Sequence, residues 1–515
     1  MRGIFLSTVG VIAVVSMARA EDPLAKKIDA VIDGKDYTQA HWGVLIVDST
    51  TGETVYARNE KKLFAPASTT KLYTCAAALA AFGHDHKFVT PVHCRGEIDK
   101  QGMLQGDLIM VASGDPSFGS RTTPEGTLAF RNGDHTYANG SEAELTETNP
   151  LLAFQDLAKQ IKAAGVKSVE GEVLIDDRLF QPTQSTGSGP SVVTSILVND
   201  NVIDLTFTPG EKPGTPAKVV ARPVSAYYQL DVVVNTGEKG SAVQITYDIA
   251  NGYSIIVRGS IPLGSKPVLR VLSVDEPAMF ARTVFIEALR NEGIRVRAAL
   301  ARPANVDFPA ADGYDKLPKI ADHTSPPLSE LLKVILKVSH NLYASTLPCL
   351  LGAKNGSRTL AGGLKEEGRL LRKLGVDTST ISFGGGAGGS NADAVTPLAT
   401  VQLLTAMAKR PDWPAYKAAL PVLGVDGTLA EVVEKDSPAR GKVFAKTGTL
   451  FWNDGLNGRS LLRSKALAGV MTTKSGRELT IAVFVNDVPL PLAIGPSREG
   501  KVLGKLCEII YENVD

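Results

Sequence analysis

The chain has 515 residues, of which 43% are hydrophobic and 21% are charged, and its formal net charge is +1. This composition is typical of a globular protein and excludes a disordered chain. The near-neutral charge gives no indication of a nucleic-acid partner or of a polybasic membrane-binding segment. The length predicts about two to four domains.

The first twenty residues are predicted to be a secretory signal peptide. Arg2 supplies a positive start, residues 4–15 are apolar, and Ala18-Arg-Ala20 has the small-x-small pattern of a cleavage site. The apolar stretch is too short to span a membrane comfortably. We therefore expect a periplasmic or otherwise extracytoplasmic protein, whose association with a membrane is peripheral at most.

The two ends of the chain both carry strand signals. Residues 41–47 and 53–57 predict a hairpin. We expect the two ends to meet in one sheet, so that a catalytic α/β domain of residues 21–86 and 306–515 is interrupted by a long insertion. The C-terminal elements are predicted strands and a closing helix, at residues 443–450, 466–472, 478–485 and 497–513.

The insertion is predicted to consist of two parts. Residues 87–195 and 265–305 form an α/β domain that contains a long, weakly periodic stretch at 113–147, rich in Gly, Ser, Thr and Asn. Loops of that length are usually functional or mobile. Residues 196–264 predict a small all-β domain, because β-branched and alternating runs are separated by turn residues.

The cysteines and histidines show no metal-site or redox spacing. Four scattered cysteines form no Cys-x-x-Cys pair, and the seven histidines form no His-x-x-x-His pair. We therefore expect no metal and no cofactor. Cys75 and Cys349 lie in apolar helical runs and are expected to be buried thiols, while disulfide pairing of Cys75, Cys94, Cys349 and Cys507 stays open.

Ser68 and Lys71 are a candidate pair of nucleophile and base. The Ala-rich run 71–82 ends at Gly83, which predicts a buried helix with a C-terminal cap. Ser68 then lies near the helix N-terminus, and Lys71 lies one turn later on the same face. A lysine acts as a base only when it is neutral, so burial or nearby positive charge must lower its pKa. The alternative is a capping serine and a surface lysine.

Two further short motifs supply partners for this pair. Ser339-His-Asn341 lies between two predicted helices and offers a hydroxyl that relays a proton and an amide that binds a carbonyl or the lysine. Lys446-Thr-Gly448-Thr449 lies on a predicted strand. It offers a positive charge, hydroxyls for a carboxylate and a glycine that lets a ligand approach the backbone. Each motif alone is weak, but the three in this order are specific.

Ser-x-x-Lys, Ser-x-Asn and Lys-Thr-Gly, in that order, are the motif set of penicillin-recognising acyl-serine enzymes. The chain resembles the class C low-molecular-mass penicillin-binding proteins of the penicillin-binding protein 4 type, which are D-alanyl-D-alanine carboxypeptidases and endopeptidases. The resemblance extends over nearly the whole mature chain and includes the flanking phrases 64–71 and 424–428. Two positions depart from it: residues 385–391 lack the usual acidic and basic residues, and Ser345 stands where a glutamate is common.

The resemblance implies a split penicillin-binding/β-lactamase-like transpeptidase domain, an antiparallel sheet with helices, that carries two inserted domains. It also implies that Ser68 attacks the bond between two D-alanines of a peptidoglycan stem peptide. Neutral Lys71 takes the proton of Ser68, and Ser339 with Lys446 passes a proton to the leaving amine. β-Lactams are the expected inhibitors, and the implied substrate-binding residues are Asn341, Thr447, Gly448, Thr449 and Asp176.

The assignment of Asp176 depends on a short local match. In the subfamily an aspartate from the second domain contacts the free amine of the substrate's third residue, and Asp176 in Val173-Leu-Ile-Asp176 is the best match, with Asp177 as the second choice. The alternative is a structural pair of turn aspartates.

Three other functions share part of this pattern. A class A β-lactamase carries a deacylating Glu-x-x-Leu-Asn motif, which neither Glu366 nor Glu367 begins. A non-catalytic cell-wall scaffold would not need its catalytic motifs intact, and an esterase would not need the Lys-Thr-Gly carboxylate site. The sequence leaves open the balance of carboxypeptidase and endopeptidase activity, the third residue of the stem peptide, the role of the all-β insertion and the oligomeric state.

Overall fold

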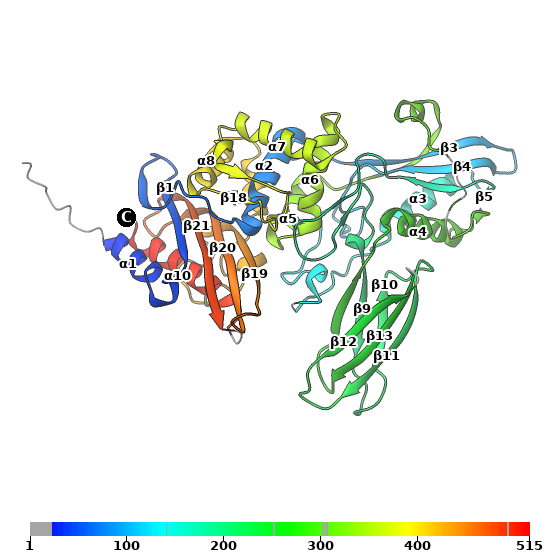
Figure 1. Ribbon diagram of the computed structural model, residues 1–515. Helices are drawn as coiled ribbons and strands as arrows, with labels where there is room; N and C mark the ends of the chain where they lie inside the picture. The colour runs from blue at the N-terminus through cyan, green and yellow to red at the C-terminus, as the bar shows by residue number, and fades with distance from the viewer. Residues whose placement is uncertain (1–22, 141, 251–252, 301–302, 304–306, 492–493) are drawn as a thin grey trace, which may run out of the picture.

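A computed structural model describes residues 23–140, 142–250, 253–300, 303, 307–491 and 494–515 (Figure 1). The predicted signal peptide, residues 1–20, lies outside the described residues.

A five-stranded antiparallel sheet joins the two ends of the chain. Its order is β19-β20-β21-β1-β2, in which β1 (His41–Asp48) from the N-terminal part pairs with β21 (Glu478–Pro491) from the C-terminal part (Figure 1). The expectation that both ends share one sheet is therefore confirmed. The other strands are β2 (Thr54–Arg58), β19 (Val443–Asp454) and β20 (Arg459–Thr472).

Both faces of this sheet are covered, which explains why β1 is a nearly continuous apolar run. Side chains alternate between the two faces of a strand. Val44 and Ile46 pack on the side of the terminal helices α1 (Pro23–Ile32) and α10 (Ser497–Asn513), whereas Leu45 packs on the opposite side.

The opposite face carries the helices that hold the first two motifs. At their centre is α2 (Thr70–Phe82), which contacts α5, α6 and α7 and has ten buried residues out of 13. A helix that is apolar all round belongs in a core, which is where the Ala-rich composition places α2. Its neighbours are α5 (Leu328–Lys337), α6 (Asn341–Lys354), α7 (Leu360–Lys373), α8 (Pro397–Ala408) and α9 (Trp413–Ala419).

A second, six-stranded sheet lies in the inserted segment, with α3 (Leu152–Ala163) and α4 (Pro277–Asn291) beside it (Figure 1). Its last strand, β16 (Lys319–Thr324), pairs with β3, although sequence reasoning assigned residues 306–515 to the catalytic domain. We propose that the boundary of the catalytic domain lies after Thr324. The remaining strands are β3 (Val89–Ile98), β4 (Met103–Val111), β5 (Ser168–Val169), β6 (Val173–Asp176) and β15 (Arg295–Val296).

Two three-stranded sheets form the elongated β-arm at the bottom of Figure 1. Five of the six strands fall in the predicted all-β segment, and the sixth, β14 (Val268–Ser273), pairs with β9. We propose that β14 belongs to the same unit. The others are β9 (Val202–Thr208), β10 (Lys218–Arg222), β11 (Gln229–Gly237), β12 (Gln244–Ala250) and β13 (Ser254–Pro262).

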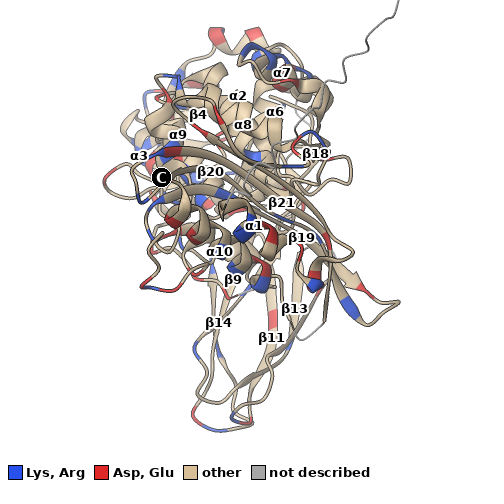
Figure 2. Ribbon diagram, turned by 90° about the vertical axis from the view of Figure 1, so that its left-hand side faces the viewer, with Lys and Arg blue, Asp and Glu red and all other residues tan. Residues whose placement is uncertain are grey.

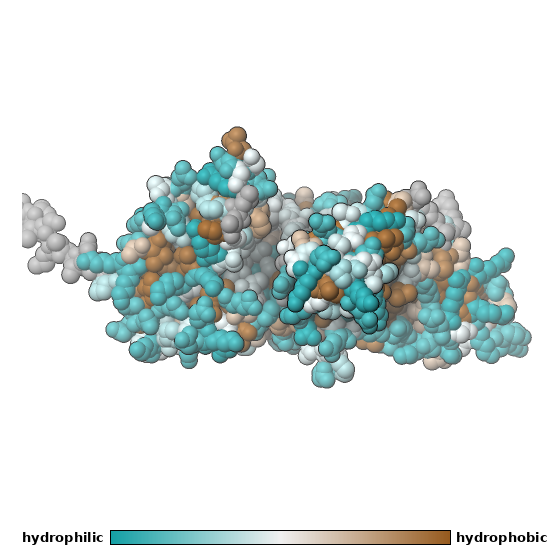
Figure 3. Space-filling view, turned by 90° about the horizontal axis from the view of Figure 1, so that it is seen from below, coloured by the Kyte–Doolittle hydropathy of each residue, from teal (hydrophilic) through white to brown (hydrophobic). Residues whose placement is uncertain are grey.

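Basic and acidic residues are interspersed along the ribbon (Figure 2), as the net charge of +1 leads one to expect. Seen from below, the surface is largely hydrophilic, with hydrophobic residues in separate patches (Figure 3). In the part of the chain that the structure describes, no helix is both long and apolar enough to cross a bilayer.

The sheet that joins the two ends gives a stability prediction. Ile46 is fully buried in β1, so Ile46→Ala removes apolar contacts and leaves a cavity, which costs about 2–5 kcal/mol of unfolding free energy. Leu456→Ala is the control, because Leu456 is 93% exposed, and we expect a change of less than about 0.5 kcal/mol. Urea denaturation measures the unfolding free energy of both variants. Equal losses of unfolding free energy in the two variants would contradict the burial pattern.

Candidate active site

The first motif spans a short 3-10 turn, η2 (Ala67–Thr69), and the start of α2. Ala67, just before Ser68, has φ +46°, in the left-handed region that non-glycine residues rarely adopt. Lys71 is fully buried, which excludes the alternative of a surface lysine.

The Lys71 amine has three oxygen neighbours. Its Nζ lies 2.9 Å from Ser68 Oγ, 2.6 Å from Asn341 Oδ1 and 2.7 Å from the carbonyl oxygen of Ala387. The amide and carbonyl oxygens only accept hydrogen bonds. A neutral amine has two N–H groups and one lone pair, so donating to these two acceptors leaves the lone pair for the Ser68 hydroxyl.

Burial also favours the neutral amine. Removal from water lowers the pKa of Lys71 to about 7, and the negative groups nearest to it, Cys75 and Asp393, oppose the shift only in part. The Cys75 thiol is itself buried, and burial raises its pKa, so it contributes little negative charge at neutral pH.

The second motif lies at the junction of α5 and α6. Ser339 has φ +65°, and its Oγ accepts a hydrogen bond from Lys446 Nζ at 3.0 Å. Asn341 begins α6 and reaches back to Lys71, while its Nδ2 donates to the carbonyl of Ser188 at 3.0 Å. The Ser188 contact brings the inserted segment to the motif, and no sequence pattern pointed to it.

The third motif lies on β19, at the edge of the five-stranded sheet. Lys446 is fully buried, and burial first, then the positive charge of Lys71, lowers its pKa. Its Nζ also donates to the Thr447 carbonyl at 2.8 Å. The hydroxyls of Thr447 and Thr449 are bonded to Thr428 Oγ1 at 2.7 Å and to Lys465 Nζ at 2.9 Å, respectively.

Gly448 is required for close packing between the first and third motifs. A Cβ at this position would lie 2.6 Å from the Pro66 carbonyl oxygen, which is closer than carbon atoms approach oxygen. The absence of a side chain therefore lets β19 lie directly against the turn that carries Ser68.

Residues 384–390, which include most of the segment 385–391 that departs from the family pattern, form a tightly packed loop, here called the glycine loop. Gly388 has φ +92°, and a Cβ there would lie 1.9 Å from the Ala67 carbonyl oxygen. The buried carboxylate of Asp393 accepts hydrogen bonds from the backbone N–H groups of Gly384 and Ser390 and so holds both ends of the loop. The loop supplies the Ala387 carbonyl to Lys71, a contact that the run of glycines did not reveal.

The structure does not bring Asp176 into this cluster. Asp176 ends β6, is 4% exposed, and accepts hydrogen bonds from Arg178 at 2.8 Å and from Tyr314 at 2.5 Å. Burial opposes ionisation, but these bonds outweigh it and hold the pKa of Asp176 below its usual value. Burial raises the pKa of the neighbouring Asp177. A substrate role for Asp176 stays a prediction.

Other groups in the described residues do not form a metal site or a disulfide. No three His, Cys, Asp or Glu side chains there are grouped to hold a metal ion. All four cysteines are free and buried, which confirms the expectation of buried thiols for Cys75 and Cys349.

Comparison with known proteins gives the family. A model of the D-Ala-D-Ala carboxypeptidase 3 (S13) family matches residues 24–494. The D-alanyl-D-alanine carboxypeptidase of Actinomadura sp. (strain R39) is 31% identical over 498 residues, which cover 92% of this chain and 82% of the relative.

Solved structures give the fold. The crystal structure of penicillin binding protein 4 from Haemophilus influenzae has a TM-score of 0.70 and 21% identity, over 94% of this chain and 99% of that one. A crystal structure of the same protein in complex with a β-lactam has a TM-score of 0.68 and 22% identity, over 95% and 99%. The predicted fold class, a penicillin-binding domain with additional domains, is confirmed. The chain belongs to the D-Ala-D-Ala carboxypeptidase 3 (S13) family of peptidases.

Proposed function

We propose that this peptidase is a penicillin-sensitive, serine-type D-alanyl-D-alanine carboxypeptidase with Ser68 as nucleophile, and that it also has endopeptidase activity. The observation that carries the proposal is the Lys71 amine, 2.9 Å from Ser68 Oγ and buried among neutral acceptors. Such an amine accepts a proton at neutral pH.

In the first half-reaction, Ser68 Oγ attacks the carbonyl carbon between two D-alanines, and its proton passes to Lys71. The C–N bond then breaks, and the leaving amine receives the proton that Lys71 took, relayed by the Ser339 hydroxyl, so that Lys71 becomes neutral again. The Lys446 ammonium donor, 3.0 Å from Ser339 Oγ, supplies the hydrogen bond that favours this transfer. In the second half-reaction, water hydrolyses the acyl-serine ester.

The remaining motif residues serve to bind the substrate. Thr447, Gly448 and Thr449 follow one another on the edge strand, where they bind the terminal carboxylate, and Asn341 orients the peptide. The backbone N–H groups of Ser68 and Thr449 form the oxyanion hole, in which the loss of one donor costs about 3 kcal/mol of barrier.

Inhibition by β-lactams follows from the same chemistry, since a β-lactam carbonyl acylates the same serine. The H. influenzae relative has been crystallised with a β-lactam. The ester should be hydrolysed slowly, because the two glutamates weighed as deacylating bases are both engaged. Glu366 is bonded to Arg369 at 2.7 Å, and Glu367 accepts from Thr74 at 3.0 Å.

The proposed partners are peptidoglycan stem peptides, in an extracytoplasmic compartment reached through the predicted signal peptide. Muropeptide digestion, with products identified by mass, separates carboxypeptidase from endopeptidase activity.

The first prediction concerns Ser68. Ser68→Ala is expected to abolish covalent labelling by a fluorescent penicillin, because no oxygen nucleophile remains at that position. Ser437→Ala is the matched control, since the Ser437 hydroxyl bonds Glu508 away from the three motifs. Labelling of the Ser68→Ala protein at the wild-type rate would contradict the mechanism. A wild-type protein that takes up no penicillin would contradict it as well.

The second prediction concerns pH. The protonated Lys71 amine has no lone pair, so the acylation rate constant should rise with pH through a pKa of about 7 and level off above it. Below the pKa the rate should fall about tenfold per pH unit. Stopped-flow acylation by nitrocefin between pH 5 and 9 measures this profile. A rate that does not change across that range would show that Lys71 is not the base.

The third prediction concerns Asp176. If its carboxylate binds the substrate amine, Asp176→Ala should lower kcat/KM about 10- to 100-fold for peptides with a free amine at the third residue, the effect of a lost charged hydrogen bond. Peptides without that amine should be unaffected. Asp177→Ala is the companion variant. If Asp176→Ala leaves the ratio of kcat/KM for peptides with and without the amine unchanged, the assignment is wrong.

A further inference from the structure

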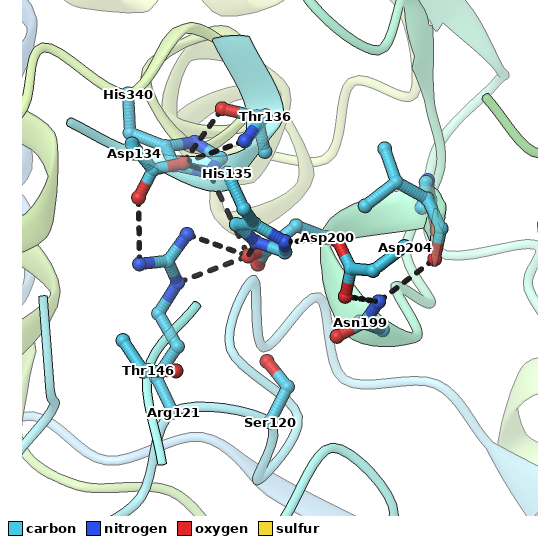
Figure 4. Close-up of polar contacts among 12 residues, drawn as sticks. Ser120, Arg121, Asp134, His135, Thr136, Thr146, Asn199, Asp200, Asp204 and His340 are labelled. Carbon is cyan, nitrogen blue, oxygen red and sulfur yellow. Dashed lines mark hydrogen bonds and ion pairs between the residues drawn. The ribbon is translucent and has the colours of Figure 1, made fainter. Parts of the chain in front are cut away.

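A network of buried charges lies beside the second motif (Figure 4). Arg121 is 2% exposed, and its guanidinium bonds Asp200 Oδ2 at 2.6 and 3.0 Å and lies 2.8 Å from Asp134 Oδ2. Arg121 and Asp134 come from the long stretch at 113–147, for which the sequence predicted no regular structure. The network therefore gives that stretch a fixed position.

His135 connects two carboxylates of the same network. Its Nε2 lies 2.7 Å from Asp200 Oδ2 and its Nδ1 lies 2.7 Å from Asp204 Oδ1. Both ring nitrogens must donate, which only the imidazolium form does. Burial opposes the charge, but Asp204 and Asp200 outweigh burial and raise the pKa of His135 to about 10.

The charges in the network balance one another. Arg121 and His135, together with Arg222 at 3.6 Å from Asp204, face the carboxylates of Asp134, Asp200 and Asp204. Buried ion pairs contribute little net stability, because desolvation of the charges cancels most of their attraction. Stability alone therefore does not explain the network, whereas a requirement for fixed geometry does.

Two tyrosines connect the network to the catalytic helices. Tyr137, two residues after His135, donates from Oη to the backbone carbonyl of Ser339 at 2.7 Å. Tyr343, in the first turn of α6, donates a short hydrogen bond from Oη to Asp200. The inserted segment thus holds the second motif on both sides of the bend between α5 and α6.

That bend needs support. The φ of +65° at Ser339 is unfavourable for a residue with a Cβ, and such a conformation persists only where its surroundings impose it. The Ser339 carbonyl oxygen accepts a hydrogen bond from Tyr137 of the inserted segment, so this bond holds the backbone directly beside the strained torsion.

We propose that Tyr137, held by the Arg121–Asp134–His135–Asp200 network, is a positioning residue that keeps the Ser339 hydroxyl directed at Lys446. The proposal rests on the proposed function, because it assumes that Ser339 transfers a proton during acylation. The inserted segment is then part of the catalytic machinery through its contact with Ser339.

Tyr137→Phe tests the proposal, because it removes one hydroxyl and leaves the ring. A displacement of about 1 Å in a reacting group costs on the order of 100-fold, so a partial loss of alignment should lower the acylation rate constant about 10-fold. Tyr228→Phe is the matched control, since the Tyr228 hydroxyl also donates to a backbone carbonyl, that of Pro223, at 2.5 Å. Both variants should lose similar amounts of thermal stability, and only Tyr137→Phe should lose acylation.

A double-mutant cycle separates positioning from general damage. If Tyr137 acts through the Ser339 hydroxyl, Tyr137→Phe should lower the rate less than about twofold in a Ser339→Ala background, because coupled residues are not additive. A further 10-fold loss in that background would overturn the proposal, as would a Tyr137→Phe protein that acylates at the wild-type rate.

Tyr343→Phe provides an independent variant on the other side of the bend. It should also lower the acylation rate constant. The effect should appear in kcat more than in KM, because the substrate-binding residues on β19 are untouched. Failure of the proposed function would appear separately, as loss of penicillin labelling in the wild type.

Discussion

The exclusion of water from the Lys71 amine is the constraint on which the site depends. An ammonium in water has a pKa far above neutrality, so lysine serves as a base only where the charged form is unfavourable. Here α2 is buried on all sides, and the partners of the amine are neutral oxygens from the adjacent Ser68 and from two distant segments, at Asn341 and Ala387. Lys446 lies in the same buried volume, where burial and then the positive charge of Lys71 lower its pKa.

Close backbone packing produces that burial. Gly448 and Gly388 lie where any side chain would collide with the backbone next to Ser68, so the edge strand and the glycine loop both pack against the same turn. Asp393 fixes the loop through its two backbone hydrogen bonds. This segment, which lacks the acidic and basic residues usual in it, contacts the lysine through a backbone carbonyl.

Much of this arrangement could be predicted from the sequence, because it depends on local patterns. The helix after Ser68 follows from its Ala-rich run, and the sheet formed by both ends follows from the strongly apolar runs in 41–47 and 478–485. The buried network could not be predicted. The backbone is in the left-handed region at Asn199, Asp200 and Asn201, with φ of +49°, +56° and +55°. The side chains that bond Asp200 come from segments up to 143 positions away. Charged residues in a weakly periodic stretch give no sign that they will be buried.

For Asp176, a local sequence match suggested a role that the contacts of the side chain do not support directly. Residues 173–176 match a known family position, but the carboxylate accepts hydrogen bonds from Arg178, two residues later, and from Tyr314. Sequence similarity over four residues identifies a strand end, but it does not show which neighbouring side chains donate hydrogen bonds to the carboxylate.

The pairing of β1 with β21 has a consequence for biosynthesis. A ribosome makes the nucleophile early, but the strand that completes the central sheet and the helix that covers it are among the last residues translated. The partner strand of β1 therefore becomes available only when the final segment has been made. A chain that stops prematurely, even one that retains all three motifs, lacks the middle strand of its own scaffold.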